Sequence, residues 1–165
     1  FGATGGVMEA ALRTVKEIVD PEDKGIVELN KLRNVDENIK EAMVKIGDLE
    51  GTVAVVHGAA NFPEMLKRIN ENPGKYVFVE FMACAGGCIN GGGQPIVPAP
   101  VQEKVNVKKL RAAALHKIDE FMDVRKSHQN PEVKALYQDF LQKPGSELAH
   151  HLLHTEYSKR DIYTK

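Results

Sequence analysis

The run FMACAGGCINGGGQP, residues 81–95, holds the only two cysteines of the chain and surrounds them with five glycines. Cys84 and Cys88 form no disulfide framework, and paired thiols in a reducing compartment more often serve metal or redox chemistry. Two thiols at i and i+4, separated by small residues, can turn toward one soft metal centre. Glycines let the backbone press close to an inorganic cluster, because they lack a Cβ atom and adopt unusual dihedral angles. The run therefore predicts a thiolate-bound metal cluster.

Two other interpretations of the run stay open on this evidence. The thiols could be buried structural residues in a tight turn, because free cysteine behaves as a small hydrophobe. Zinc fits less well, because structural zinc takes four ligands and the sequence offers no second C-x-x-C pair or nearby histidine pair.

The charge of the chain excludes partners that need a strong field. Lys and Arg number 22 and Asp and Glu 23, which gives a formal net charge of -1 over 165 residues. Such a chain has no long-range field to attract nucleic acid or an anionic membrane. No stretch approaches the roughly 18 to 20 apolar residues that span a bilayer, and the first residues lack the order of a signal peptide. We therefore expect a cytoplasmic protein without nucleic-acid or membrane partners.

Apolar residues at intervals of three and four predict several helices. Thr4 is a candidate cap for the first, and Asn61 with Glu64 forms a candidate capping box for the second. Asn106 and Asn130 are candidate caps further along. The expected helices cover residues 4–19, 61–72, 107–124, 132–142 and 147–157.

Four segments have the composition of β-strands: residues 25–33, 38–47, 51–58 and 75–81. The first three follow one another as in a meander. A helix between the last two favours a parallel pairing there. The strand 75–81 is almost continuously apolar, as expected of a strand covered on both faces, and the cysteine run begins where it ends. In α/β folds ligands bind at this end of a strand.

The fold class expected is α/β, with one small mixed sheet of about four strands and helices packed on it. We expect this α/β core over residues 1–100 and a helical C-terminal segment over residues 101–165. Between them PIVPAPVQ, residues 95–102, places three prolines in six residues, and we expect it to lie extended on the surface.

Three segments resemble the iron-only, or [FeFe], hydrogenases. ACAGGCINGGGQP, preceded by Glu80, Phe81 and Met82, is similar to the third signature of their catalytic domain. FGATGGVMEAALR, at residues 1–13, is similar to the segment that precedes it, and the tail from RKSHQNP to HHLLHTEY is similar to the end of that domain. The resemblance covers essentially the whole chain and implies the C-terminal lobe of a hydrogenase catalytic domain.

The resemblance also implies roles for particular residues. In the family, the first cysteine of this signature binds the [4Fe-4S] part of the H-cluster, and the second binds that cubane while bridging to the di-iron site. These positions are Cys84 and Cys88. Met82 takes the position of a methionine beside the di-iron ligands, and Gly5 and Gly6 lie in backbone that lines the cluster pocket.

The family's other two signatures, which carry the remaining cluster cysteines and the proton-relay thiol, are not among these 165 residues. We therefore expect a fragment or a split subunit that needs an N-terminal lobe as its partner. The parent would reduce protons reversibly to H₂ and exchange electrons with a ferredoxin-type or NAD(P)H-linked carrier. A cubane needs four protein ligands, so we expect this chain alone to hold no complete H-cluster and to evolve no hydrogen.

Other functions fit parts of the sequence less well. GATGGV resembles a nucleotide-binding turn, but the third spaced glycine is replaced by Met8 and no strand precedes it. Non-catalytic iron–sulfur assembly and nuclear recognition proteins share the cysteine signature, and sensory hydrogenase relatives stay open. His150 and His154 lie one helical turn apart, but without a third ligand a solvated helix face is the better interpretation than zinc.

Overall fold

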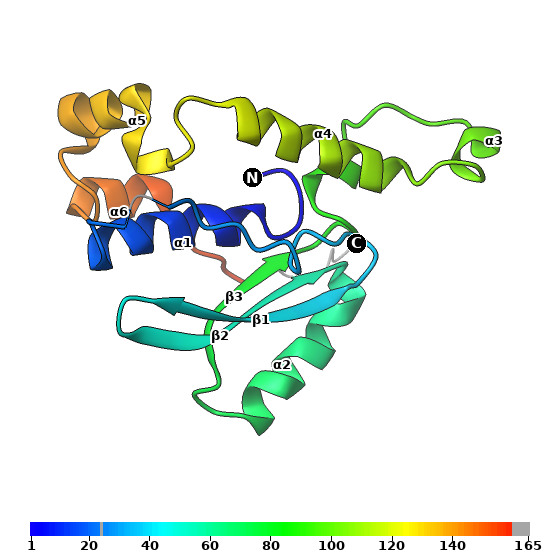
Figure 1. Cartoon of the computed structure of the whole chain (residues 1–165), viewed down its shortest axis with the longest axis horizontal. Coiled ribbons are helices and arrows are strands. Elements are labelled where there is room, and N and C mark those ends of the chain that lie inside the picture. The colour runs from blue at the N-terminus through cyan, green and yellow to red at the C-terminus, as the bar shows by residue number, and fades with distance from the viewer. Residues whose placement is uncertain (24, 160–165) are drawn as a thin grey trace, which may run out of the picture. The chain divides into compact units, whose positions relative to one another are not determined.

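The computed structural model of the protein describes residues 1–23 and 25–159. These residues form several helices and one sheet, which confirms the α/β class, although the sheet has three strands in place of about four (Figure 1). The chain divides into two compact units, Phe1–Lys126 and Ser127–Lys165. The sheet and the cysteine run both belong to the first unit.

The sheet has the strand order β1-β2-β3 and contains both kinds of strand pairing. β1 (Ile39–Ile46) and β2 (Leu49–His57) form an antiparallel hairpin, and Gly47 in its tight turn has a φ of 56°. β2 then pairs in parallel with β3 (Tyr76–Met82) by way of helix α2 (Phe62–Glu71). The predicted parallel pairing is thus confirmed.

The expected strand over residues 25–33 is wrong, and so is the meander. This segment runs without strand or helix along α1 (Gly6–Val19), whose side chains satisfy its backbone. The Glu9 carboxylate accepts the N–H of Leu29 at 2.7 Å, and the Arg13 guanidinium donates to a carbonyl of the segment at 3.2 Å. Because its backbone groups find partners on a helix, the segment needs no sheet neighbour.

β3 is an edge strand in the described part of the chain, and exposed side chains on it show that the expectation of two covered faces is also wrong. Val77 and Phe81 are 62% and 40% exposed, and Glu80 is the buried residue of the strand. An exposed apolar edge strand is a surface that folded proteins normally cover.

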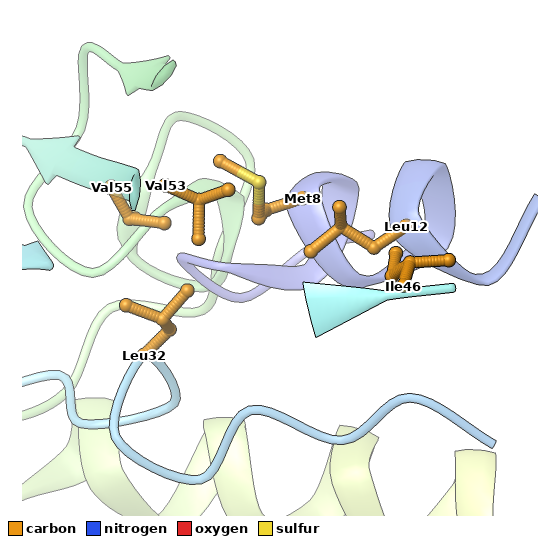
Figure 2. Packing of buried hydrophobic residues seen from close by; sticks show 6 residues of the cluster. All are labelled: Met8, Leu12, Leu32, Ile46, Val53 and Val55. Carbon is orange, nitrogen blue, oxygen red and sulfur yellow. The ribbon is translucent and has the colours of Figure 1, made fainter. Parts of the chain in front are cut away.

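Side chains of β2 alternate between two hydrophobic clusters, as successive residues of a strand must. One cluster joins α1 to the sheet, and the other joins α2 to it. The first consists of Met8, Leu12, Leu32, Ile46, Val53 and Val55 (Figure 2), and the second of Ala54, Val56 and Met65. Full burial of a side chain of this kind contributes about 1.5–3 kcal/mol, so both helices are fixed on the sheet.

Two predicted helix caps are wrong because tertiary contacts occupy the side chains. The residue before α1 is Gly5, with a φ of 88°, and the Thr4 hydroxyl instead accepts a hydrogen bond from the Lys40 ammonium. Asn61 precedes α2, but its side-chain amide donates to the carbonyls of His57 and the next residue. Neither α1 nor α2 therefore begins with the predicted side-chain cap.

The later caps are confirmed. The Asn106 side chain accepts the N–H of Lys109 at 3.0 Å at the start of α4, and the Asn130 side chain caps α5. Ser146, which was not a predicted cap, caps the last helix in the same way. The proline-rich segment is extended only as far as Pro98, because proline is tolerated in the first turn of a helix. The remaining elements are α3 (Ala99–Gln102), α4 (Val107–Phe121), α5 (Pro131–Leu136), a π-helical turn (Tyr137–Leu141) and α6 (Glu147–Leu153).

Over the ranges 1–23 and 25–159, no helix combines the length and the apolar character that a membrane span requires.

A buried lysine ties β1 to the start of the chain. Lys40 is 1% exposed, and its ammonium donates to the carbonyls of Leu32 and Asn34, both at 2.7 Å, and to the Thr4 hydroxyl at 3.3 Å. Burial lowers the pKa of Lys40 to about 8, although the negative charge of Glu80 partly opposes this shift. The lysine is therefore held in place by hydrogen bonds while its charge is costly to bury.

The Lys40→Met variant should show that this charge makes the stability of the fold depend on pH. Unfolded Lys40 keeps its proton up to its ordinary pKa of 10.5, so between about pH 8 and 10.5 the unfolded state binds more protons. Rising pH in this window should stabilise the wild type by roughly 2 to 3 kcal/mol more than the variant. Urea unfolding of both proteins at pH 7 and pH 10 measures this. The same difference in unfolding free energy between wild type and variant at both pH values would contradict it.

Candidate metal centre

The two cysteines lie in an irregular loop that starts where β3 ends, at the carboxyl end of the parallel strand pair. This cysteine loop, residues 83–95, has left-handed backbone at Gly86 and Gly87, with φ of 86° and 94°. A 3₁₀ turn follows over Cys88–Asn90. Both Cys84 and Cys88 are unpaired thiols and are exposed, so the interpretation of buried structural thiols is wrong.

The first residues of the chain pair with the cysteine loop. The N–H of Thr4 donates to the carbonyl of Gly86 at 2.9 Å, and the N–H of Ile89 donates to the carbonyl of Gly2 at 3.2 Å. Ala3 forms an isolated antiparallel bridge with Gly87 between these bonds. Two segments more than 80 positions apart in sequence thus meet at the cysteines.

Gly87 stands where this contact is tightest, and it accounts for the position of Met82. A Cβ atom on Gly87 would lie 2.8 Å from the Gly2 carbonyl oxygen, 2.9 Å from the Thr4 nitrogen and 2.8 Å from the Met82 sulfur. No side chain fits at these distances, so only glycine lets the two backbones and the thioether meet here. Met82 therefore places its sulfur against the backbone between the two cysteines.

Gly91 has a related role beside the first cysteine. A Cβ atom at this position would lie 3.2 Å from the Cys84 sulfur and 3.6 Å from the carbonyl oxygen of Cys88. The Cys84 side chain is therefore turned toward the backbone that follows Cys88.

Gly5 and Glu80 fix the start of α1 next to this loop. Gly5 has the left-handed φ of 88°, and a Cβ atom there would lie 2.9 Å from the carbonyl oxygen of Leu32. The buried Glu80 carboxylate accepts the N–H of Gly5 at 2.7 Å and the N–H of Met8 at 2.8 Å. Such charge-assisted bonds at a helix N-terminus replace the missing side-chain cap and link α1 to β3.

His57 supports the loop from the end of β2. Its side chain is completely buried, and Nδ1 accepts the N–H of Gly86 at 3.0 Å. Burial lowers the pKa of His57, and the positive charge of Lys40 lowers it further, so the ring is neutral and Nδ1 is free to accept. Within the described residues Nε2 makes no hydrogen bond of good geometry. The backbone of Glu37 acts to raise the pKa of His57 and so opposes part of this lowering.

The structure brings most of the predicted site residues together. Met82, Cys84 and Cys88 lie in or beside the cysteine loop, and Gly5 lies at the helix start that Glu80 joins to β3. Gly6 is the first residue of α1, and a Cβ atom there would meet only the backbone of Phe1, so no contact of Gly6 with the loop is evident.

Sequence reasoning missed Glu80, His57 and Arg111 as supports of the loop. Arg111, on α4, donates to the carbonyls of Ile89 and Pro95 at 2.9 and 3.0 Å. A polar residue inside an almost continuously apolar strand was the available signal for Glu80. His57 and Arg111 carry no such signal, because their partners are backbone atoms far away in sequence.

The residues present fit an iron–sulfur cluster. Cysteine thiolates are the usual ligands of such clusters, and glycine-rich backbone beside the thiols leaves room for inorganic sulfide and N–H groups to hydrogen-bond it. Two thiolates are half of the four that a cubane takes. Over residues 1–23 and 25–159, no group of three His, Cys, Asp or Glu side chains is placed to hold a metal ion.

A cavity of about 720 Å³ borders the cysteine loop at Asn90 and Gly91 and extends to Lys108 and Arg111, but it is not lined by either cysteine.

In the second unit His150 and His154 are both exposed, with ring centroids 4.3 Å apart. The exposure of His150 on α6 agrees with the predicted solvated face, but α6 ends at Leu153, so the expected helix over residues 147–157 is too long and His154 follows it.

Family models match two segments of the chain. Residues 1–92 match the iron only hydrogenase large subunit, C-terminal domain, and residues 105–160 match the iron hydrogenase small subunit. Iron hydrogenase 1 of Clostridium pasteurianum is 45% identical over 159 residues, 96% of this chain and 28% of that protein. The NADP-reducing hydrogenase subunit HndD of Solidesulfovibrio fructosivorans is 44% identical over 160 residues, 97% of this chain and 26% of that protein.

The chain therefore spans about a quarter of the length of these two relatives. Among solved structures, a variant of the [FeFe]-hydrogenase HydA1 from Chlamydomonas reinhardtii is 33% identical with a TM-score of 0.71, over 95% of this chain and 45% of that one. The cytosolic iron-sulfur assembly component 3 of Rattus norvegicus is also similar, at 30% identity over 156 residues, 94% of this chain and 31% of that protein.

Proposed function

The chain belongs to the iron-only hydrogenase family, and from this premise we propose that it is part of an enzyme that reduces protons reversibly to H₂. In this proposal Cys84 and Cys88 supply two of the four cysteine ligands of an H-cluster. The observation that carries it is the meeting of two exposed thiols with a glycine-rich loop that the start of the chain closes.

Each residue of the site has a distinct task in this proposal. Cys84 would bind the [4Fe-4S] cubane, and Cys88 would bind the cubane and bridge to the di-iron subcluster. When bound, the H-cluster would supply the metal centre at which two protons and two electrons from the reduced carrier form H₂. Met82 packs its thioether against Gly87 and would border the di-iron side, where an apolar sulfur keeps water away without adding charge.

The backbone of the site is held by hydrogen bonds that do not involve a metal. Glu80 and His57 fix the two ends of the contact through the N–H groups of Gly5 and Gly86. Because these hydrogen bonds join buried side chains to backbone N–H groups, they are less easily broken than contacts of exposed side chains. The backbone that carries the cysteines is therefore preorganised. Such a frame limits the reorganisation that accompanies each electron transfer.

The remaining two ligands would come from residues outside this sequence. The exposed apolar residues Val77 and Phe81 of β3 offer a surface on which another lobe of the same catalytic domain could pack. A ferredoxin-type or NAD(P)H-linked carrier would then exchange electrons with the assembled protein. The name of the NADP-reducing relative accords with the second kind of carrier.

A non-catalytic iron–sulfur function is the second candidate. The similarity to the cytosolic iron-sulfur assembly component over 94% of this chain favours it as the alternative. Cluster binding at Cys84 and Cys88 is common to both candidates, so hydrogen turnover is what separates them.

Anaerobic reconstitution with iron and sulfide tests this proposal. The 165-residue chain should retain no complete cluster and evolve no hydrogen, because it offers two thiolates where a cubane takes four. The complete protein that contains the chain, isolated anaerobically with both the cubane and the di-iron subcluster in place, should hold the cluster and evolve hydrogen from a reduced carrier. Iron quantitation, electron paramagnetic resonance and a hydrogen assay make the comparison.

Two outcomes would overturn parts of the proposal. Stable cluster binding with hydrogen turnover by the 165 residues alone would show that other ligands complete the site. A complete protein that holds both the cubane and the di-iron subcluster but turns over no hydrogen would contradict the hydrogenase function, and binding of a cubane alone in protein isolated from its own cells would favour the non-catalytic function.

A further inference from the structure

Arg111 of α4 is hydrogen-bonded to two points of the cysteine loop. One guanidinium nitrogen donates to the carbonyl of Ile89 at 2.9 Å, and a second donates to the carbonyl of Pro95 at 3.0 Å. These carbonyls flank the three glycines at 91–93, so one side chain clasps both ends of the glycine run. The planar guanidinium has donors in a fixed fork and can serve two acceptors at once, which a lysine ammonium does less well.

The glycine run has few other restraints. A Cβ atom on Gly92 or Gly93 would meet nothing within 4 Å, so neither residue packs against a neighbour. Within the described residues, the side-chain hydrogen bonds to carbonyls of positions 89–95 come from Arg111. The carbonyl of Ile89 belongs to the residue directly after Cys88, so this bond restrains the backbone that carries the second thiol.

Arg111 can restrain the loop because its helix, α4, is itself fixed on the rest of the first unit. Ala112 is buried in a cluster with Ala3 and Ile89. At the other end of the helix, the Asp119 carboxylate makes a two-pronged ion pair with Arg13 of α1, at 2.7 and 2.9 Å. The helix that carries the Arg111 guanidinium is therefore held in place by packing and by an ion pair.

We propose that Arg111 is a positioning residue of the metal centre: by clasping Ile89 and Pro95 it fixes the direction of the Cys88 thiolate, although it binds no metal. This inference rests on the proposed function for its cluster-related part. Arg111 lies in the segment that matches the small-subunit model, whereas Cys88 lies in the segment that matches the large-subunit model. The clasp thus makes the small-subunit-like segment part of the site.

Arg111→Lys and Arg111→Gln test the clasp, with Lys117→Gln as control on an exposed position of the same helix. Arg111→Lys keeps the charge and loses the fork, whereas Arg111→Gln loses both. The complete protein carrying each substitution is examined without metal by hydrogen exchange and with metal by electron paramagnetic resonance. The melting temperature and circular dichroism report the global fold.

Both Arg111 variants should exchange the amides of residues 89–94 at least about tenfold faster than wild type, while the amides of β2 stay as protected as before. Their cluster spectra should shift and broaden, and Lys117→Gln should match wild type in both measurements. Unchanged loop exchange and unchanged spectra in Arg111→Lys and Arg111→Gln would overturn the proposal, as would an equal rise in exchange over the whole sheet. If the wild type itself binds no cluster, the proposed function fails, while the loop exchange still decides the role of Arg111.

Discussion

Replacing Cys88 with serine is expected to leave the complete protein with at least about tenfold less iron than the wild type. Loss of a partner outside the ligand shell already costs metal sites about 10–100-fold in affinity, and loss of a thiolate ligand should cost more. In the proposed function Cys88 touches both parts of the H-cluster, so hydrogen turnover should vanish with the iron. Cys84→Ser should also lose iron, because a cubane with three thiolates is labile.

Ala85→Ser is the matched control for these cysteine variants. It adds a hydroxyl between the two cysteines, at a half-buried position, while both thiols remain. Iron and sulfide quantitation after identical anaerobic preparation should give near wild-type values for this variant. If Cys84→Ser and Cys88→Ser retain as much iron as Ala85→Ser, the cysteine loop is not the metal centre.

Gly87→Ala is expected to destabilise the chain by roughly 3 kcal/mol or more. An alanine at its φ of 94° is strained by about 1–2 kcal/mol, and the new Cβ atom would lie within 3 Å of both the Gly2 oxygen and the Thr4 nitrogen. Backbone atoms on both sides cannot move aside as a flexible side chain can. The contact between the start of the chain and the cysteine loop should therefore open, which urea unfolding of the apo protein measures.

Two neighbouring glycines separate the sources of this effect. Gly93→Ala meets the same dihedral strain, at a φ of 87°, but no neighbouring atom, and should cost only about 1–2 kcal/mol. Gly92→Ala meets neither, and should stay within about 0.5 kcal/mol of wild type. Equal stability of Gly87→Ala and Gly92→Ala would show that the backbone contact at Gly87 is not tight.

The parts of the fold that the sequence predicts well depend on local patterns. The apolar strand 75–81 follows a helix with Pro63 in its first turn, and this order favours a parallel pairing whatever the rest of the chain does. Residues 25–33 have an equally strand-like composition, but their apolar side chains pack against α1 and Glu9 takes a backbone N–H. Composition alone cannot tell these two uses of apolar residues apart.

In the candidate site, too, local sequence patterns predict some residues, while others depend on contacts between segments far apart in sequence. Cys84 and Cys88 can be predicted from their spacing and the glycines around them, because all these residues lie together in one short run of the sequence. In the sequence Glu80 is only one residue of a signature, and its role of accepting two N–H groups of the start of α1 depends on how β3 and α1 meet in space. Likewise, the buried His57 acts on Gly86, 29 positions away, and nothing in its own neighbourhood predicts that partner.

Diffraction at the iron absorption edge from anaerobic crystals of the complete protein tests the central claim most directly. The account predicts anomalous iron density at the cysteine loop, with the sulfurs of Cys84 and Cys88 each about 2.3 Å from an iron atom, as in other metal–thiolate bonds. The two sulfurs should then lie roughly 6 to 7 Å apart on one cluster. Iron density elsewhere in the protein, or thiols pointing to opposite faces of β3, would contradict the account.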